Sequence, residues 1–317
     1  MRLLTYPEAI VVGLLQGVTE LFPVSSLGHS VLLPALIGGR WARDLSVSAP
    51  ESPYLAFVVG LHVATALALL LFFWRDWVRI LGGFVSSVRY RRIVTPEERL
   101  AWMIVLATIP VGISGLLLEH TFRTVLGRPA PAAAFLVLNG LILFGAERLR
   151  RRAARDAHVR AAVAAAIDGA GGVYRGRSVP DRTQGDPDER LASGTLSRAV
   201  QIGSAQILAL LPGISRSGAT MGAGLLKGLS HEDAARFSFL LATPVILAAG
   251  VLKLPDLFGP LGAGIHGQVL AGSVASFAAA YLAVRFLTRY FEHRTLTPFA
   301  IYSVAAGLAG LAWLTLR

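Results

Sequence analysis

The chain has 317 residues, of which 54% are hydrophobic and only 15% are charged, and its mean hydropathy is +0.59. Soluble domains carry about 25% charged residues, and several apolar runs here approach the ~20 residues that cross a bilayer, so we exclude a soluble protein with a large core. The net charge of +11 comes from arginine blocks between apolar runs, a pattern that argues against nucleic-acid binding. The absence of cysteine excludes disulfides, thiolate metal sites and cysteine nucleophiles.

The first apolar stretch, residues 7–38, is interrupted by the polar sequence QGVTELFPVSSLGHS. The interruption divides it into two arms, each too short to cross a bilayer. Broken backbone at that depth is tolerated only where protein or a wet cavity surrounds it. We therefore expect a re-entrant hairpin of two half-helices here, and a second one at residues 196–229, where LLPGISRSGAT is the interruption.

Each hairpin is followed by three predicted spanning helices, which makes an all-α integral membrane protein with six spans. The predicted spans are residues 53–74, 100–118, 132–147, 236–252, 266–288 and 297–316. The polar segment 148–193 is expected to be a flexible cytoplasmic loop, although its arginine- and alanine-rich start also suits an extension of the preceding helix. The prediction is one membrane domain, with residues 1–147 and 194–317 as its halves.

The two interruptions resemble each other when Pro23 is placed on Pro212, which also places Ser26 on Ser215. We interpret this likeness as a weak internal repeat. Three predicted spans, an odd number, separate the hairpins, so the copies are expected to be inverted in the membrane. Inverted repeats of broken helices predict a site near the midplane, between the two halves.

Arginine content predicts the orientation of the chain. The segments 75–99, 148–198 and 285–294 are rich in arginine, whereas the segments 39–53, 119–131 and 253–265 are poorer. These two sets alternate across the six spans. The positive-inside rule therefore places the rich set in the cytoplasm and both termini outside.

Glu20 is an ionisable residue at membrane depth, which costs about 2.5–3.5 kcal/mol on insertion scales and usually serves function. Gln16 lies four residues earlier and shares its helix face. A carboxylate here suits either a divalent cation or an accepted proton. The alternative is a buried glutamate with a structural hydrogen bond.

Ser25 and Ser26 follow Pro23, and either hydroxyl can cap the second half-helix. Ser25 is also a candidate phosphate ligand. Ser26 and His29 then fall at positions i and i+3, on one face. A hydroxyl beside an imidazole is a nucleophile–base arrangement. The alternative, which the sequence leaves open, is a pair of capping serines and a hydrogen-bonded core histidine.

The second motif breaks its helix and begins a new one near a cluster of candidate phosphate ligands, Gly213, Ser215, Arg216 and Ser217. The N–H groups of a helix N-terminus bind anions, and the forked guanidinium of Arg216 suits phosphate. An arginine at this depth needs a partner, so a structural pair with Glu20 is the alternative. Both interpretations hold if that pair opens when ligand arrives. The whole set suits a lipid-linked phosphate or diphosphate.

The first motif resembles one signature of the bacterial undecaprenyl-diphosphatase family, and PGISRSGAT resembles its second. Their order and the spans between them fit as well, so the resemblance covers nearly the whole chain apart from 148–193. It implies a multi-pass enzyme of the bacterial cytoplasmic membrane, with a site open to the periplasm and a divalent cation, Mg²⁺ or Ca²⁺. It also implies removal of one phosphate from undecaprenyl diphosphate for cell-wall synthesis, and bacitracin resistance.

Carried over by position, the resemblance places Gln16 and Glu20 in the acidic motif, Ser26 and His29 as the catalytic pair, and Arg216 as the phosphate ligand. The sequence departs from the family pattern at Gln16, where a glutamate is common, and at Leu27, where a hydroxyl residue is common. The first change removes one negative cation ligand. Any metal is therefore expected on Glu20 and substrate oxygens, with a weaker contribution from Gln16.

The sequence leaves the nucleophile open among Ser26, His29 and water. It also leaves open a rival function, a lipid flippase or transporter, because inverted repeats with broken helices are a transporter pattern. The expected partners are the lipid substrate, the bilayer and, as a candidate, a second copy of the chain. No nucleic-acid partner is expected.

Overall fold

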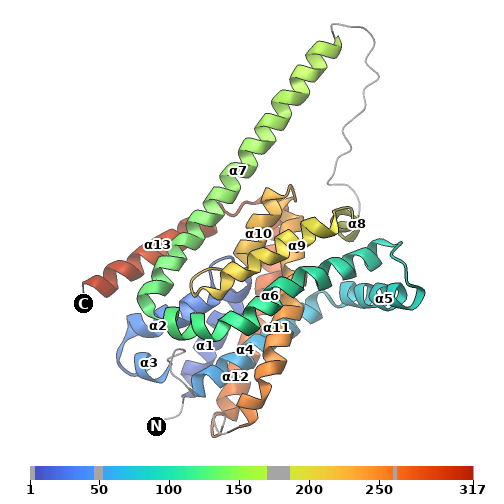
Figure 1. Ribbon diagram of the computed structural model, residues 1–317. Helices are drawn as coiled ribbons and strands as arrows, with labels where there is room; N and C mark the ends of the chain where they lie inside the picture. Colours follow the sequence, from blue (N-terminus) through green and yellow to red (C-terminus); the bar gives the residue numbers. More distant parts are fainter. Residues whose placement is uncertain (1–3, 46–52, 170–185, 260–262, 317) are drawn as a thin grey trace.

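The computed structural model describes residues 4–45, 53–169, 186–259 and 263–316, and these residues form helices without a strand (Figure 1). The first half contains α1 Tyr6–Leu21, α2 Ser26–Ile37, α3 Gly39–Asp44, α4 Pro53–Phe72, α5 Trp74–Tyr90, α6 Pro96–Leu126 and α7 Pro129–Gly169. The second half contains α8 Pro187–Ala192, α9 Leu196–Ser204, the 3₁₀ helix η1 Ala205–Leu210, α10 Arg216–Leu226, α11 His231–Phe258, α12 His266–His293 and α13 Thr297–Thr315.

Five described helices are long and apolar enough to cross a membrane, namely α6, α7, α11, α12 and α13. They coincide with five of the six predicted spans. The sixth prediction, 53–74, falls on α4, which passes the same test only together with α5. The chain bends by 85° between these two helices, so α5 does not continue the direction of α4. The fold is that of a multi-pass membrane protein.

Large apolar side chains cover the outer faces of these spans. Leu116 and Leu117 of α6 are 75% and 73% exposed, and Leu270 of α12 and Ile301 of α13 are 67% and 63% exposed. In water this much exposed apolar surface would drive association. The same surface is expected of helices that face lipid, because lipid tails are as apolar as leucine.

Where the structure describes the segment 148–193, the predicted flexible loop is wrong, and the alternative of a helix extension is confirmed for the start of the segment. Residues 148–169 continue α7, which projects beyond the other helices in Figure 1, and residues 187–192 form α8. The reason is composition, since alanine, arginine and leucine in this stretch are all strong helix formers. Within α8, Asp188 is buried and accepts from Arg79 of α5 and Arg236 of α11 at 2.9 and 2.8 Å. Residues 170–185 lie outside the described residues.

Both predicted hairpins exist as broken helix pairs. In the first, α1 ends at Leu21 and α2 begins at Ser26. In the second, α9 tightens into η1 before the break, and α10 begins at Arg216. Each proline lies in the break, where its missing N–H and fixed φ are tolerated.

The first arm of each hairpin packs against a span from the other half of the chain. α1 packs on α12 through Gly17, where an added Cβ would overlap the carbonyl of Ser276. α9 packs on α6 through Gly203, where an added Cβ would overlap the carbonyl of Ala107. Small residues allow such close approach of membrane helices. This exchange between halves suits an inverted repeat, which stays a prediction.

Gly17 also fixes the depth of the first hairpin. It faces Ala280, which lies halfway along the 28 residues of α12. Glu20 follows one helical turn later. The first polar motif therefore lies beside the middle of α12, which is long enough to cross a bilayer. The motif is thus deep among the packed helices.

Candidate active site

The two helix breaks are built alike. Ser25 caps α2 and Ser215 caps α10, and each hydroxyl accepts the backbone N–H three residues ahead, at 3.2 and 3.1 Å respectively. The predicted match of Ser26 with Ser215 is therefore wrong by one residue, because Pro23 stands one position closer to its cap than Pro212 does. Ser26 instead matches Arg216, since both are the first residue of a half-helix.

These two first residues meet on one carboxylate. Arg216 donates to Oε1 of Glu20, and Ser26 donates to Oε2 at 2.5 Å. The Glu20 side chain is only 6% exposed and that of Arg216 only 15%. The two motifs thus converge, and the pair of Glu20 with Arg216, left open by the sequence, is formed. A second guanidinium nitrogen of Arg216 reaches the carbonyl of Ala242 in α11 at 3.5 Å.

Gln16 and His62 complete the surroundings of Glu20. The Gln16 amide donates to Glu20 Oε2 at 3.0 Å and lies 3.2 Å from Nε2 of His62. The other ring nitrogen of His62 lies 2.8 Å from the Val58 carbonyl, which places a proton on Nδ1. His62 Nε2 is 3.5 Å from the carboxylate, and its side chain is 32% exposed. His62 is therefore more accessible to solvent than Arg216, the other cationic partner of Glu20.

His29 does not pair with Ser26, although the two lie on one helix turn. Its Nδ1 lies 2.7 Å from the Ser25 carbonyl and its Nε2 lies 2.8 Å from the Tyr302 hydroxyl of α13. The carbonyl only accepts, so Nδ1 carries the proton and Nε2 accepts from Tyr302. Both ring nitrogens are thus engaged, and Ser26 has Glu20 as its hydrogen-bond partner instead.

Asn139 of α7 joins the two breaks. Its amide nitrogen donates to the Pro23 carbonyl at 3.0 Å, and its amide oxygen accepts the Ser215 N–H at 2.9 Å. The nitrogen also reaches the Ser303 hydroxyl of α13 at 3.2 Å. Asn139 is 1% exposed. One buried side chain therefore fixes the distance between the two breaks.

The remaining predicted phosphate ligands hold the breaks together in this structure. The hydroxyls of Ser217 and Ser215 donate to the Phe22 carbonyl at 3.2 and 3.4 Å. Gly213 has a φ of 113°, and an added Cβ on Gly28 would lie 2.9 Å from its Cα. Side chains at this contact would separate the two breaks.

Ser25 itself has a positive φ of 68°, which is uncommon for a residue with a side chain. Such conformations cost on the order of 1–3 kcal/mol and persist where the surroundings impose them, often at functional sites. Here the hydroxyl of Ser25 caps α2 while its carbonyl holds His29. The strained residue thus positions two predicted site residues at once.

Residues 9–309 match the family described as bacitracin resistance protein BacA. The chain belongs to this family. A protein of Mycolicibacterium paratuberculosis named undecaprenyl-diphosphatase is 69% identical over 318 positions, with 99% of each chain covered. Proteins of Frankia alni and Granulibacter bethesdensis with the same name, numbered 2 in the former, are 56% and 42% identical, with at least 96% of each chain covered.

The donor set of this BacA family protein fits a divalent cation only in part. Among the described residues, no three His, Cys, Asp or Glu side chains cluster as a metal site. Glu20 supplies one carboxylate, to which the Gln16 carbonyl and the Ser26 hydroxyl add neutral oxygens. Ca²⁺ takes six to eight oxygens, whereas Mg²⁺ is often held by one or two carboxylates and substrate phosphates. The site therefore suits a cation that arrives with phosphate.

Sequence reasoning missed three residues of this site, His62, Asn139 and Tyr302. A usable signal existed for the first two, because each is a polar residue inside an apolar run, and such residues usually have a function. Tyr302 gave no signal, since tyrosines are common near the ends of membrane helices. Which motif each one joins depends on how the helices pack.

Proposed function

We propose that this chain hydrolyses undecaprenyl diphosphate to undecaprenyl phosphate and inorganic phosphate, as the names of its relatives indicate for them. The observation that carries the proposal is the meeting of two half-helix N-termini, through Ser26 and Arg216, on Glu20. Helix N-termini and a guanidinium suit a phosphate anion, and the lipid tail explains why they lie among membrane helices.

In the first step the terminal phosphate takes the place of Glu20 beside Arg216. A phosphate offers the guanidinium two oxygens, whereas Glu20 offers it Oε1 alone, so Arg216 exchanges one anion for another without becoming an unpaired buried charge. The hydroxyls of Ser215 and Ser217 and the N-terminus of α10 lie on the same break and complete the phosphate site. Glu20 is then free to act as a base.

Ser26 is the nucleophile that the geometry favours, because its hydroxyl already donates to Glu20. Its Oγ bonds to the terminal phosphorus as the bond to the bridging oxygen breaks, and Glu20 takes the hydroxyl proton. The lipid monophosphate leaves, and water then hydrolyses the phosphoserine. His62, adjacent to Glu20 and more exposed, carries the proton outward. His29 positions Ser25 and thereby the start of α2.

A divalent cation, Mg²⁺ or Ca²⁺, is proposed as the cofactor. Glu20, Ser26 and the side-chain oxygen of Gln16 are the residues that would hold it together with the substrate. When bound, the cation supplies neutralisation of the diphosphate charge. Because residue 16 is a glutamine and not a glutamate, the site binds a cation only weakly when no substrate is present. Cation binding is therefore expected to depend on the diphosphate.

The orientation is part of the proposal. We place the chain in the bacterial cytoplasmic membrane with the site opening to the periplasm, on the strength of the arginine distribution. A homodimer stays a candidate assembly. A role in lipid transport is the rival, and a liposome assay separates the two, since a transporter would move lipid without releasing phosphate.

The test measures phosphate release from undecaprenyl diphosphate by purified protein with cation present. Ser26→Ala, Glu20→Gln and Arg216→Lys are expected to lose at least about 100-fold in kcat, the scale for removing one stabilising group. Ser204→Ala is the control, because among the residues that the structure describes the Ser204 hydroxyl bonds only within its own helix, to the Val200 carbonyl. Substrate labelled on the terminal phosphate should leave label on the wild type and none on Ser26→Ala. Wild-type activity in Arg216→Lys and Glu20→Gln would refute the site.

A further inference from the structure

The ends of three side chains in the active site form a small triangle. The amide nitrogen of Gln16 lies 3.0 Å from Oε2 of Glu20 and 3.2 Å from Nε2 of His62, and the latter two atoms lie 3.5 Å apart. Gln16 and Glu20 belong to α1, whereas His62 belongs to α4. Three polar groups from two different helices therefore meet at one place.

His62 presents an electron pair to this triangle. Its Nδ1 donates to the Val58 carbonyl at 2.8 Å, so Nε2 is the unprotonated nitrogen and accepts from the Gln16 amide. Histidines that bind metals are held in the same way, with the second ring nitrogen donating to a backbone carbonyl or a carboxylate. His29 differs, because both of its ring nitrogens bond to groups outside the triangle. His62 is thus oriented as a metal ligand and His29 is not.

The amide group of Gln16 occupies the position that a cation would take. Its nitrogen donates to two acceptors, Oε2 of Glu20 and Nε2 of His62, and so lies between a carboxylate and an imidazole electron pair. Half a turn of the amide brings its oxygen to the place of its nitrogen. A carboxylate oxygen, an amide oxygen and an imidazole nitrogen would then face one point.

The spacing of the triangle is that of ligands on a single ion. Two ligand atoms that are each about 2.1 Å from an ion lie about 3.0 Å apart at a right angle and about 3.4 Å apart at the tetrahedral angle. The three edges of 3.0, 3.2 and 3.5 Å lie within or beside this range. The His62 side chain is 32% exposed, which gives an ion a path from solvent.

Arg216 decides when an ion can bind, because it donates to the Glu20 carboxylate. A guanidinium and a divalent cation on the same carboxylate repel each other. In the proposed first step the diphosphate takes Arg216, which leaves Glu20 with Gln16 and His62 alone. Phosphate oxygens and waters supply the remaining ligands, as they commonly do for a divalent cation that acts on a phosphate. The substrate therefore completes the site.

We propose that Nε2 of His62 is a ligand of the divalent cation, together with Glu20 and the Gln16 side-chain oxygen, and that the ion is Mn²⁺ rather than Mg²⁺ or Ca²⁺. The inference rests on the proposed function and refines its cofactor. Mg²⁺ and Ca²⁺ prefer oxygen ligands, whereas Mn²⁺ suits oxygen ligands and, as a transition-metal ion, also binds imidazole. His62 can hold the ion and later carry a proton, because Nε2 is free once phosphate and ion have left.

The test is pulsed electron paramagnetic resonance of Mn²⁺ bound to the full-length protein in detergent. The probe is Mn²⁺ together with undecaprenyl methylenediphosphonate, an analogue that cannot be hydrolysed between its two phosphorus atoms. The wild type is expected to show modulation from a directly bound nitrogen. The modulation should change when the protein is made with histidine that carries the heavy nitrogen isotope, because the bound nitrogen then belongs to an imidazole.

His62→Gln should remove the nitrogen modulation and weaken Mn²⁺ binding at least about tenfold, the scale for altered metal sites. Binding of Ca²⁺, measured by competition, should change less than about threefold, because Ca²⁺ gains little from the nitrogen. In the wild type Mn²⁺ should bind more tightly than Ca²⁺ or Mg²⁺. His62→Asn is a second variant in case His62→Gln does not fold, and a melting temperature without metal checks the fold of each.

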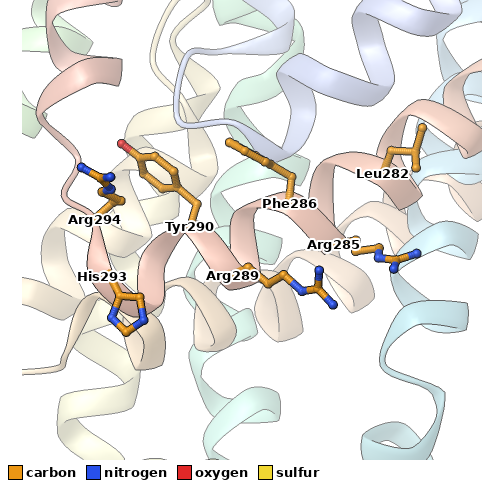
Figure 2. A pocket seen from close by; sticks show the side chains of 7 residues that line it. All are labelled: Leu282, Arg285, Phe286, Arg289, Tyr290, His293 and Arg294. Carbon is orange, nitrogen blue, oxygen red and sulfur yellow. The ribbon is translucent and has the colours of Figure 1, made fainter.

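Two other histidines serve as controls, and their replacement by glutamine should keep the nitrogen modulation. His29 is the stringent control, because it lies in the active site. His293 is the remote control, because its side chain is 84% exposed and Figure 2 shows it on the groove of α12 with Arg289 and Arg294. The charges of these arginines repel a cation.

The proposal is wrong if the wild type with the analogue binds no Mn²⁺, or binds it without nitrogen modulation. It is also wrong if the modulation survives in the His62 variants, if His29→Gln abolishes it instead, or if Ca²⁺ or Mg²⁺ binds as tightly as Mn²⁺. These measurements do not depend on turnover. Phosphate release without nitrogen modulation would contradict this inference alone, whereas nitrogen modulation without phosphate release would contradict the proposed activity alone.

Discussion

Replacing Asn139 by alanine should separate the two helix breaks without replacing any residue that is proposed to contact substrate. The change removes hydrogen bonds to the Pro23 carbonyl, the Ser215 N–H and the Ser303 hydroxyl. Interhelical hydrogen bonds in membrane proteins average about 0.6 kcal/mol, so three of them correspond to about 2 kcal/mol of stability. A displacement of about 1 Å between reacting groups can cost roughly 100-fold in rate, and that is the loss in kcat expected for Asn139→Ala.

The assay compares phosphate release per folded molecule with the unfolding temperature in detergent. Asn139→Asp should be at least as damaging as alanine, because its second oxygen would face the Pro23 carbonyl, acceptor against acceptor, and a buried carboxyl group is costly at this depth. Ser87→Ala is the matched control, since Ser87 is 3% exposed and accepts the indole N–H of Trp102 at 2.9 Å, on α5 and α6. It should lower stability and leave kcat unchanged. If Asn139→Ala is less stable than wild type yet has the same kcat, the hydrogen bonds of Asn139 between the two breaks do not set the geometry of the site.

Three further changes test other contacts. Gly28→Ala should reduce kcat by about 100-fold, because its Cβ would lie 2.9 Å from the backbone of the second break, whereas Gly82→Ala has open space and should stabilise α5 by about 0.5–1 kcal/mol. Tyr302→Phe removes the hydrogen-bond donor to His29 and should lower kcat roughly tenfold, in line with the loss of one partly buried hydrogen bond. An unchanged kcat would show that this contact of His29 plays no part in the site. Asp188→Asn weakens two ion pairs to arginines and should lower the free energy of unfolding by about 2–3 kcal/mol with kcat intact, as followed by proteolysis near α8.

Much of the fold was predictable because the bilayer imposes a simple length rule. Apolar runs of about 20 residues predicted five spans correctly, and the proline-containing interruptions predicted both broken helix pairs. The prediction of a flexible loop at 148–193 was wrong where the structure describes the segment, whereas the alternative, a helix extension over its alanine- and arginine-rich start, is confirmed. The bend of 85° after α4 was also beyond hydropathy, because α5 is amphipathic and continues the helical pattern.

For the site, the sequence by itself identified Glu20 and Arg216 as candidate residues, since both are costly at membrane depth unless they serve a purpose. Only the tertiary structure decided how they pair. Ser26 pairs with Glu20 and not with His29, because the Ser25 carbonyl and the Tyr302 hydroxyl engage both ring nitrogens of His29. The contacts of His62, Asn139 and Tyr302 with the motifs join residues 46 to 273 positions apart. Local spacing carries no information about such contacts, because they depend on how separate helices pack.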